Sequence, residues 1–153
     1  MRALLQRVRS GSVVVEDRAV GSISQGLVIL AAIGEQDTTT QVEQMASKIV
    51  HLRIFNDAEG RFNRSLLDVN GEALVVSQFT LYADTRRGRR PNFTAAAAPE
   101  LARGLLEQFA STLCDLGVSS VETGRFGASM VVELQNDGPV TIWLDTDHWG
   151  SSR

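Results

Sequence analysis

Cysteine and histidine are scarce in this sequence, with Cys114 as the single cysteine and His51 and His148 as the only histidines. One thiol forms neither an internal disulfide nor a multi-cysteine metal site, which favours a reducing, cytoplasmic setting. The two histidines lack the paired spacing of metal ligands, and no HExxH or CxxC motif occurs. We therefore expect no metal and no cofactor, and we expect Cys114 to be a small buried side chain on a helix.

Other familiar signatures are missing as well. The chain has no GxSxG nucleophile elbow and no GxxxxGK(S/T) phosphate loop, which argues against a conventional triad hydrolase. No apolar run approaches the roughly 20 residues that a membrane crossing needs. The opening MRALLQRVRSGSV lacks the continuous apolar stretch of a signal peptide. With 43% apolar and 22% charged residues in 153 positions, the composition predicts a single soluble, untargeted domain.

Part of the positive charge is clustered in one short segment. Lys48 is the only lysine among 15 basic residues, and four of the arginines lie close together, at Arg86, Arg87, Arg89 and Arg90. The planar guanidinium suits bidentate contacts with phosphate. On a chain of net charge −3, such a loop fits one charged ligand held in one place, although a solvated loop that only aids solubility has the same pattern.

The first third of the chain predicts β structure, and two later segments predict helices. Residues 2–16 and 20–24 read as paired strands, and the apolar run 27–33 as a buried strand. Apolar residues recur at three- and four-residue spacing over 39–55 and 99–116, which indicates two amphipathic helices. A residue near the start of the first, Asp37 or a threonine, can cap it, and Pro99 and Gly117 mark the ends of the second.

The remaining strands complete an α+β pattern. We expect strands at 72–82, 119–122, 128–135 and 140–145, with NDG forming a hairpin turn between the last two. The order favours a mainly antiparallel, barrel-like sheet with two covering helices. It predicts one domain over residues 1–146 and a frayed C-terminal tail over 147–153.

The segment SQFTLYAD, which begins at Ser77, admits two interpretations. It is a plain strand with Phe79 and Leu81 pointing inward, or it is part of a site in which Ser77, Gln78 and Thr80 lie beside backbone amides. Thr80 is the one candidate nucleophile, but no histidine lies nearby in sequence to take its proton. Backbone N–H groups directed at a developing oxyanion are the better hypothesis.

The segment NDGPVT is unusual because Pro139 stands where a strand is expected to begin. A tight turn explains part of it. An X–Pro bond is also cis at a cost of only about 0.5–1 kcal/mol. A cis bond between Gly138 and Pro139 would turn the neighbouring carbonyls to one side, where they can line a rigid pocket built from the main chain.

SQFTLYAD and NDGPVT, in this order and spacing, resemble the two signature motifs of the D-aminoacyl-tRNA deacylase family. The likeness extends to the opening MRALLQRV, to the long stretch from KIVHLRIF to RRPNF, and to VETGRFGA. It therefore covers nearly the whole chain. The resemblance implies a cytoplasmic, metal-independent homodimer that hydrolyses the ester joining a D-amino acid, or glycine, to the terminal adenosine of tRNA.

The resemblance also implies roles for particular residues. Gly138 and Pro139, in the cis form, would enter the site of the other subunit at the dimer interface and act as the chirality filter. The pocket and the oxyanion side would come from Ser77, Gln78, Phe79 and Thr80. Main-chain carbonyls can hold the α-ammonium and exclude an L side chain whatever its type, whereas they cannot exclude glycine.

Several further assignments are less direct. With no acid–base residue in view, the ribose hydroxyl of the substrate is a candidate participant in hydrolysis, and Thr80 then has a positioning role. Phe126 and Met130 are either walls around the terminal adenosine or core residues. Arg7 is a candidate brace for the glycine–proline loop, and the residues Arg86, Arg87, Arg89 and Arg90 are candidates for contacts with tRNA phosphates.

Two other functions remain open from the sequence. One is a non-catalytic RNA-binding dimer that uses the arginine loop for phosphates, with salt-dependent binding and no turnover. The other is an esterase or amidase for small D-amino-acid derivatives.

Overall fold

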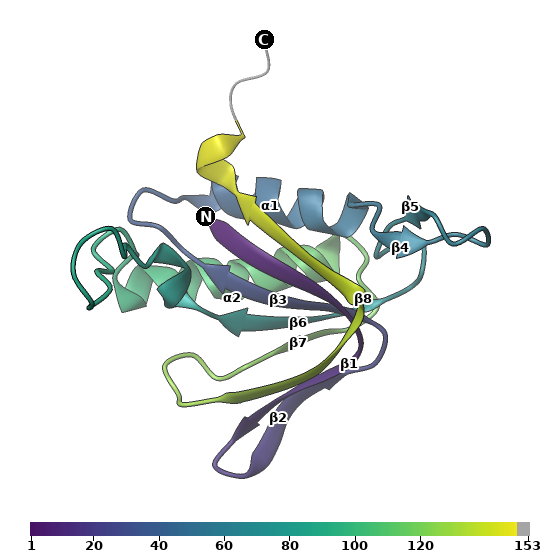
Figure 1. Ribbon diagram of the computed structural model, residues 1–153, viewed down its shortest axis with the longest axis horizontal. Helices are drawn as coiled ribbons and strands as arrows, with labels where there is room; N and C mark the ends of the chain where they lie inside the picture. Colours follow the sequence, from purple (N-terminus) through teal and green to yellow (C-terminus); the bar gives the residue numbers. More distant parts are fainter. Residues whose placement is uncertain (150–153) are drawn as a thin grey trace.

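The computed structural model describes residues 1–149 and has one curved six-stranded sheet with two helices packed over part of it, together with a separate two-stranded sheet (Figure 1). The elements are β1 (Arg2–Val15), β2 (Arg18–Ile23), β3 (Gly26–Ala32), α1 (Thr39–His51), β4 (Phe55–Asn56), β5 (Phe62–Arg64), β6 (Glu72–Ser77), η1 (Phe79–Tyr82), α2 (Pro99–Asp115), β7 (Val121–Thr123), β8 (Val131–Asp145) and η2 (Thr146–His148).

The sheet runs in the order β2-β1-β3-β6-β7, and β8 pairs with β1 along nearly its whole length. Pairs with β1 are antiparallel, whereas β3–β6 and β6–β7 are parallel. The parallel pairs arise because α1 lies between β3 and β6 and α2 between β6 and β7, as crossover helices require. The predicted α+β class with two covering helices is confirmed, in a mixed sheet.

The sheet is curled until it nearly closes into a barrel. Its two edge strands approach each other closely, since a Cβ added at Gly21 of β2 would lie 2.8 Å from the carbonyl oxygen of Thr123 in β7. This closure divides the apolar interior into two cores. β3 and β6 are buried on both faces, which explains their continuous apolar sequences.

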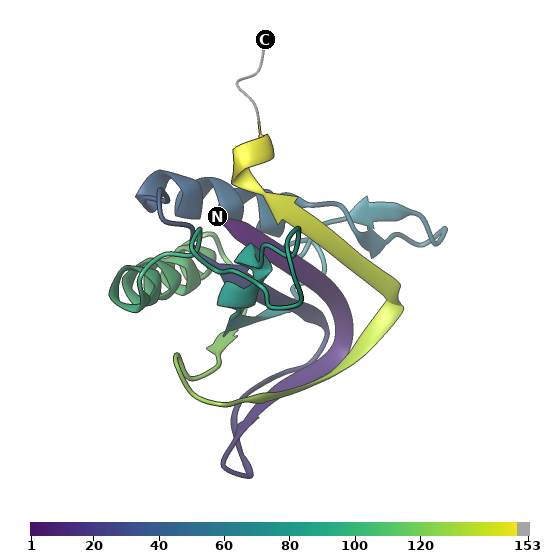
Figure 2. The same cartoon turned by 60° about the vertical axis from the view of Figure 1, so that its left-hand side comes forward.

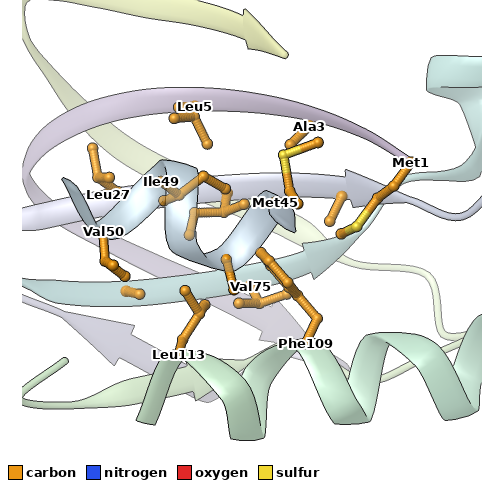
Figure 3. Close-up of a cluster of buried hydrophobic side chains, with 14 of the residues drawn as sticks. Met1, Ala3, Leu5, Leu27, Met45, Ile49, Val50, Val75, Phe109 and Leu113 are labelled. Carbon is orange, nitrogen blue, oxygen red and sulfur yellow. The ribbon is translucent and has the colours of Figure 1, made fainter. Parts of the chain in front are cut away.

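The larger core lies between the sheet and the two helices (Figure 3). Leu27 of β3 lies near Met45 and Ile49 of α1, and Ile29 of β3 and the fully buried Phe109 of α2 belong to the same core. The smaller core fills the curled part of the sheet and consists of Val8, Val13, Val15, Ile23, Val28, Leu74 and Val76. Because successive side chains of a strand point to opposite faces of the sheet, β1, β3 and β6 each contribute residues to both cores.

Both helices form where the sequence predicts them, with one end displaced. Thr38 caps α1 in a capping box with Gln41, and α1 ends at His51 because Leu52 is already extended. The prediction that this helix continues to residue 55 is therefore wrong. Cys114 near the end of α2 is exposed, so the expectation of a buried cysteine is also wrong.

The two ends of the described chain meet. The Met1 ammonium is buried, forms a salt bridge of 2.5 Å with Asp37, and donates to Thr146 Oγ1 at 2.6 Å. The first residues of the predicted tail belong to the short 3-10 helix η2, and Lys48 of α1 lies over the Trp149 ring. The remainder of the predicted tail, residues 150–153, lies outside the described residues. Within residues 1–149, neither helix has the length and apolar composition that a membrane crossing requires.

Candidate active site

The SQFTLYAD segment leaves the sheet instead of continuing it. β6 ends at Ser77, the Gln78 N–H donates to the Ala31 carbonyl at 2.8 Å, and residues Phe79–Tyr82 form the 3-10 helix η1. The prediction of one strand over 72–82 is therefore wrong beyond residue 77. Phe79, expected to point inward in a strand, is 54% exposed.

The start of η1 carries the polar groups of this segment. No side chain caps its first N–H groups, which belong to Phe79 and Thr80. The Gln78 side-chain amide hydrogen-bonds to Thr80 Oγ1 at the exposed surface. Thr80 therefore has its neighbour Gln78, and no histidine, as a hydrogen-bond partner.

An apolar cavity of about 390 Å³ opens beside this segment, a size typical of small-molecule sites. Ser77 and Phe79 form one side of it, and the Phe79 ring packs edge-to-face on Phe93 at 5.1 Å. We call it the apolar cavity, and its full lining is Ala32, Ile33, Ser77, Phe79, Phe93, Ala96, Ala97, Pro99, Ala102, Leu106, Phe126 and Gly127. It can hold a flat, largely apolar group such as a nucleobase.

A second cavity, of about 290 Å³, shares Ser77, Leu106 and Phe126 with the first. We call it the basic cavity, since its other lining residues are Val75, Arg103, Glu107, Thr123, Gly124 and Arg125. Phe126 thus stands between two hollows, as a wall of both. Met130 lines neither cavity and packs beside the smaller core, although a Cβ added at Gly124 of the basic cavity would lie 2.7 Å from its Sδ.

The NDGPVT segment is a bulge inside one continuous strand. Gln6 of β1 pairs with Thr141 and Val8 pairs with Asn136, so β8 has four residues where β1 has one, Arg7. The predicted hairpin between two strands is therefore wrong, because both halves of β8 pair with the same partner (Figure 2). The Gly138-Pro139 peptide bond in this bulge is cis.

Two side chains hold the bulge from behind. Arg7, only 5% exposed, donates from Nε to the Asp137 carbonyl at 3.1 Å and from Nη1 to the Ile54 carbonyl at 2.7 Å. Asn136 bonds both main-chain groups of Val140, accepting from its N–H at 3.0 Å and donating to its carbonyl at 3.2 Å. These bonds replace the main-chain hydrogen bonds between β8 and β1 that the bulge interrupts. Gly138 and Pro139 themselves remain exposed.

Glycine is required at the tip of the bulge. Gly138 has φ +123°, and an added Cβ would lie 2.9 Å from both Arg7 Nη2 and Val140 Cγ2. Any side chain there would displace the brace itself.

The bulge and the apolar cavity lie apart within one chain. The strands β1 and β3 stand between β8 and β6, so three strand spacings, on the order of 14 Å, separate the two segments. Neither Gly138 nor Pro139 lines the cavity that holds Ser77 and Phe79. A single chain therefore does not join the two motifs into one site.

The arginine loop is only partly free. Arg86 binds Asp84 in a bidentate pair of 2.9 and 2.6 Å, and this hydrogen bonding lowers the pKa of Asp84 to about 2. Arg87, Arg89 and Arg90 are exposed. The loop thus offers its later arginines to a ligand, whereas Arg86 serves to fix the loop.

Sequence reasoning missed several residues that shape these features. Phe93 and Arg103 gave no local signal, because each contacts an aromatic ring far away in sequence, Phe79 and Phe126 respectively. Asn136 bonds Val140 within its own strand, but only the bulge brings these two residues together. Over residues 1–149, no group of three or more histidine, cysteine or acidic side chains is arranged to hold a metal ion.

Comparison with known proteins gives these features a family. The model of the family described as D-Tyr-tRNA(Tyr) deacylase matches residues 4–145. A D-aminoacyl-tRNA deacylase of Roseiflexus sp. (strain RS-1) is 62% identical over 146 residues, covering 95% of this chain and 94% of the relative. One from Herpetosiphon aurantiacus is 53% identical over 153 residues, covering 100% and 99%.

Solved structures agree with the fold. A protein named c-Myc DNA Unwinding Element Binding Protein superposes with a TM-score of 0.90 at 39% identity, covering 95% of this chain and 98% of that one. A probable eukaryotic D-amino acid tRNA deacylase superposes with a TM-score of 0.80 at 19% identity, covering 94% and 97%, and shows the shared fold alone. The fold and the relatives define a deacylase, an enzyme of the hydrolase class. The chain belongs to the D-aminoacyl-tRNA deacylase family, as its motifs predict.

Proposed function

We propose that this protein hydrolyses the ester bond of D-aminoacyl-tRNA and releases the D-amino acid and free tRNA. The observation that carries the proposal is the bulge at Gly138 and Pro139, an exposed piece of main chain braced by Arg7 and Asn136. Family membership supplies the reaction class. Since the substrate is an aminoacyl-tRNA, we assign the reaction to the cytoplasm.

The bulge suits a filter for chirality rather than for side-chain type. Main-chain carbonyls at Gly138 and Pro139 can accept hydrogen bonds from the α-ammonium of the substrate and leave no room for an L side chain. A side-chain pocket would instead discriminate substrates by size, at about 1–3 kcal/mol for each methylene. On this account glycine, which lacks a side chain, is also hydrolysed.

We propose that the working form is a homodimer with its sites at the subunit interface. This is supported by the separation of the bulge from the apolar cavity, because each chain has both parts but does not join them. It is supported further by exposed apolar side chains on β8 on both sides of the bulge, Val131 at 61% and Trp143 at 47%. A partner that covers this strand would carry its own bulge toward the cavity of the first chain.

The cavity side would hold the terminal adenosine and the reacting carbonyl. Phe79 and Phe126 offer aromatic walls for the base, and the uncapped N–H groups at the start of η1 suit a developing oxyanion. Thr80, which bonds Gln78, has a positioning role, and the ribose hydroxyl of the substrate assists hydrolysis. The exposed residues Arg87, Arg89 and Arg90 would contact phosphates of the tRNA body.

The test is release of free amino acid from purified protein with D-Tyr-tRNA, L-Tyr-tRNA and Gly-tRNA as substrates. We expect hydrolysis of the first and third and none of the second. Equal hydrolysis of the D and L esters would contradict the filter. Salt-dependent binding of uncharged tRNA or of DNA, without turnover of any ester, would support a nucleic-acid-binding protein instead. Faster turnover of a short D-aminoacyl ester than of D-Tyr-tRNA would support a small-molecule esterase.

A further inference from the structure

The basic cavity adjoins the proposed adenosine site and has no role in the function proposed so far. Its shared wall with the apolar cavity is the ring of Phe126, and Arg103 of α2 lies over that ring with its guanidinium 5.0 Å from the centroid. An arginine stacked on an aromatic face loses much of its freedom before any ligand arrives. The Arg103 guanidinium is therefore already placed at the boundary of the two cavities.

The lining of the basic cavity has a net positive charge. Arg103 and Arg125 line it, and neither forms a salt bridge with any carboxylate of residues 1–149. Glu107 is the one acidic residue in the lining. Arg86 in the arginine loop is different, because Asp84 already neutralises it. The basic cavity thus offers two guanidinium groups to an anionic ligand.

We propose that the basic cavity is the subsite for the phosphodiester that joins the terminal nucleoside of tRNA to the nucleotide before it, with Arg103 and Arg125 as its anion-binding side chains. This inference rests on the proposed function and adds a binding site to it. A nucleoside that lies against Phe126 in the apolar cavity carries its 5′ phosphate one sugar away, and the basic cavity is the adjoining hollow, with Ser77, Leu106 and Phe126 in common. The two arginines of this lining carry the charge that a phosphate requires, and a guanidinium group can donate two parallel hydrogen bonds to its oxygens.

The arginine loop is a poorer candidate for this particular phosphate. The hollow beside it is lined by Asp84, Arg86, Arg87 and Asn92 and shares no residue with the apolar cavity. The basic cavity shares three. The loop therefore fits phosphates farther along the tRNA, whereas the basic cavity fits the one nearest the ester.

Binding of adenosine and of adenosine 5′-monophosphate to the wild-type protein tests the subsite without any turnover. We expect the monophosphate to bind at least about tenfold more tightly, in keeping with a charge-assisted contact. Arg103→Gln and Arg125→Gln should each remove most of that preference and leave adenosine affinity within about twofold. Glu107→Gln should increase the preference. Arg18→Gln, an exposed arginine on β2, is the matched control and should change neither affinity.

Turnover gives an independent measurement with D-tyrosyl esters of adenosine and of the dinucleotide CpA, which carries the phosphodiester. Arg103→Gln should lower kcat/KM about tenfold for the dinucleotide ester and leave the nucleoside ester unchanged. Equal losses on both esters would overturn the proposal, since Arg103 would then act only through Phe126. Equal binding of adenosine and its monophosphate by the wild type would also overturn it. If the monophosphate preference depends on both arginines but no ester is hydrolysed, the subsite stands and the proposed function fails.

Discussion

The apolar cavity and the β8 bulge are built in opposite ways. Side chains from several elements wall the cavity, among them Phe79 of η1 and Phe126 after β7. The exposed part of the bulge is the short segment of Gly138 and Pro139, which is held by the side chains of Arg7 and Asn136. On the proposed function, the cavity accepts a chemical group common to all substrates by its shape, whereas the bulge tests the configuration that all D-amino acids share.

The difference also predicts how each region responds to substitution. A side chain in the cavity wall can be shortened with a graded loss of contact area. The bulge depends instead on a few hydrogen bonds, from Arg7 and Asn136, and a substitution removes such a bond completely. At Gly138 there is also no space for an added atom between Arg7 and Val140. Changes in the bulge should therefore have larger effects, and they should alter selectivity rather than affinity.

The largest effect is expected for Gly138→Ala. Its new Cβ would lie 2.9 Å from Arg7 Nη2, so the bulge must shift, and a displacement near 1 Å in a reacting geometry costs about 100-fold in rate. Single-turnover hydrolysis of D-Tyr-tRNA measures it. Gly104→Ala is the control, because Gly104 lies in α2 with nothing within 4 Å of the added carbon. Activity within a few-fold of wild type for Gly138→Ala would show that the bulge is not part of the site.

Removing the second brace should have the next largest effect. Asn136→Ala deletes both bonds to Val140, of 3.0 and 3.2 Å, and should lower the free energy of unfolding by about 1–2 kcal/mol. We expect the ratio of D-Tyr-tRNA to L-Tyr-tRNA hydrolysis to fall about tenfold, since a loosened filter admits L side chains.

Asn136→Asp is the matched variant. It keeps an acceptor for the Val140 N–H but sets a carboxylate oxygen against the Val140 carbonyl in place of the donor, so its selectivity should fall at least as far as that of Asn136→Ala. Denaturant unfolding and the two hydrolysis rates give both quantities. A loss of stability with unchanged selectivity in both variants would reduce Asn136 to a purely structural residue.

A smaller and different effect is expected on the cavity side. Phe79→Ala removes a ring that packs on Phe93 and is 54% exposed, which should raise KM for D-Tyr-tRNA about fivefold through lost contact with the base. The ratio of D to L hydrolysis should not change. Altered chiral selectivity in this variant would contradict the division of roles between cavity and bulge.

The smallest effect is expected for Thr80→Ala. If the backbone provides the oxyanion contacts, loss of the hydroxyl that bonds Gln78 should lower kcat less than about threefold. Thr80→Ser, which retains a hydroxyl, should match the wild type. Complete loss of activity in Thr80→Ala with an unchanged Tm, restored in Thr80→Ser, would assign Thr80 the role of nucleophile.

The sequence predicted the elements whose pattern is long and local. Strands β1 to β3 and both helices follow from alternation and from helical spacing. Helix α1 is shorter than predicted. Ile54 and Phe55 continue the apolar pattern in sequence, but they pack into the core from backbone beyond the end of the helix. In α2, Cys114 follows directly after the buried residues Leu105, Leu106, Phe109 and Leu113. Its residue type alone therefore did not predict that Cys114 is exposed.

The sequence predicted which residues belong to the candidate site but not the backbone conformation that places them. NDG signals a reversal equally well in a hairpin and in a bulge, and pairing of both halves of β8 with β1 decides between them. Phe79 and Leu81 have the spacing of a strand, although β6 ends at Ser77. The cavities could not be predicted at all, because their walls come from segments far apart in sequence.

The central claim, that the bulge of one chain completes the cavity of another, is tested most directly by complementation between two inactive variants. Gly138→Ala damages the bulge, and Ala96→Trp fills the apolar cavity that Ala96 lines. The two variants would carry different affinity tags, and the mixed dimer would be isolated after refolding together. One of its two sites then has both parts intact, so hydrolysis of D-Tyr-tRNA should return. A mixed dimer as inactive as either parent would contradict a site shared between subunits.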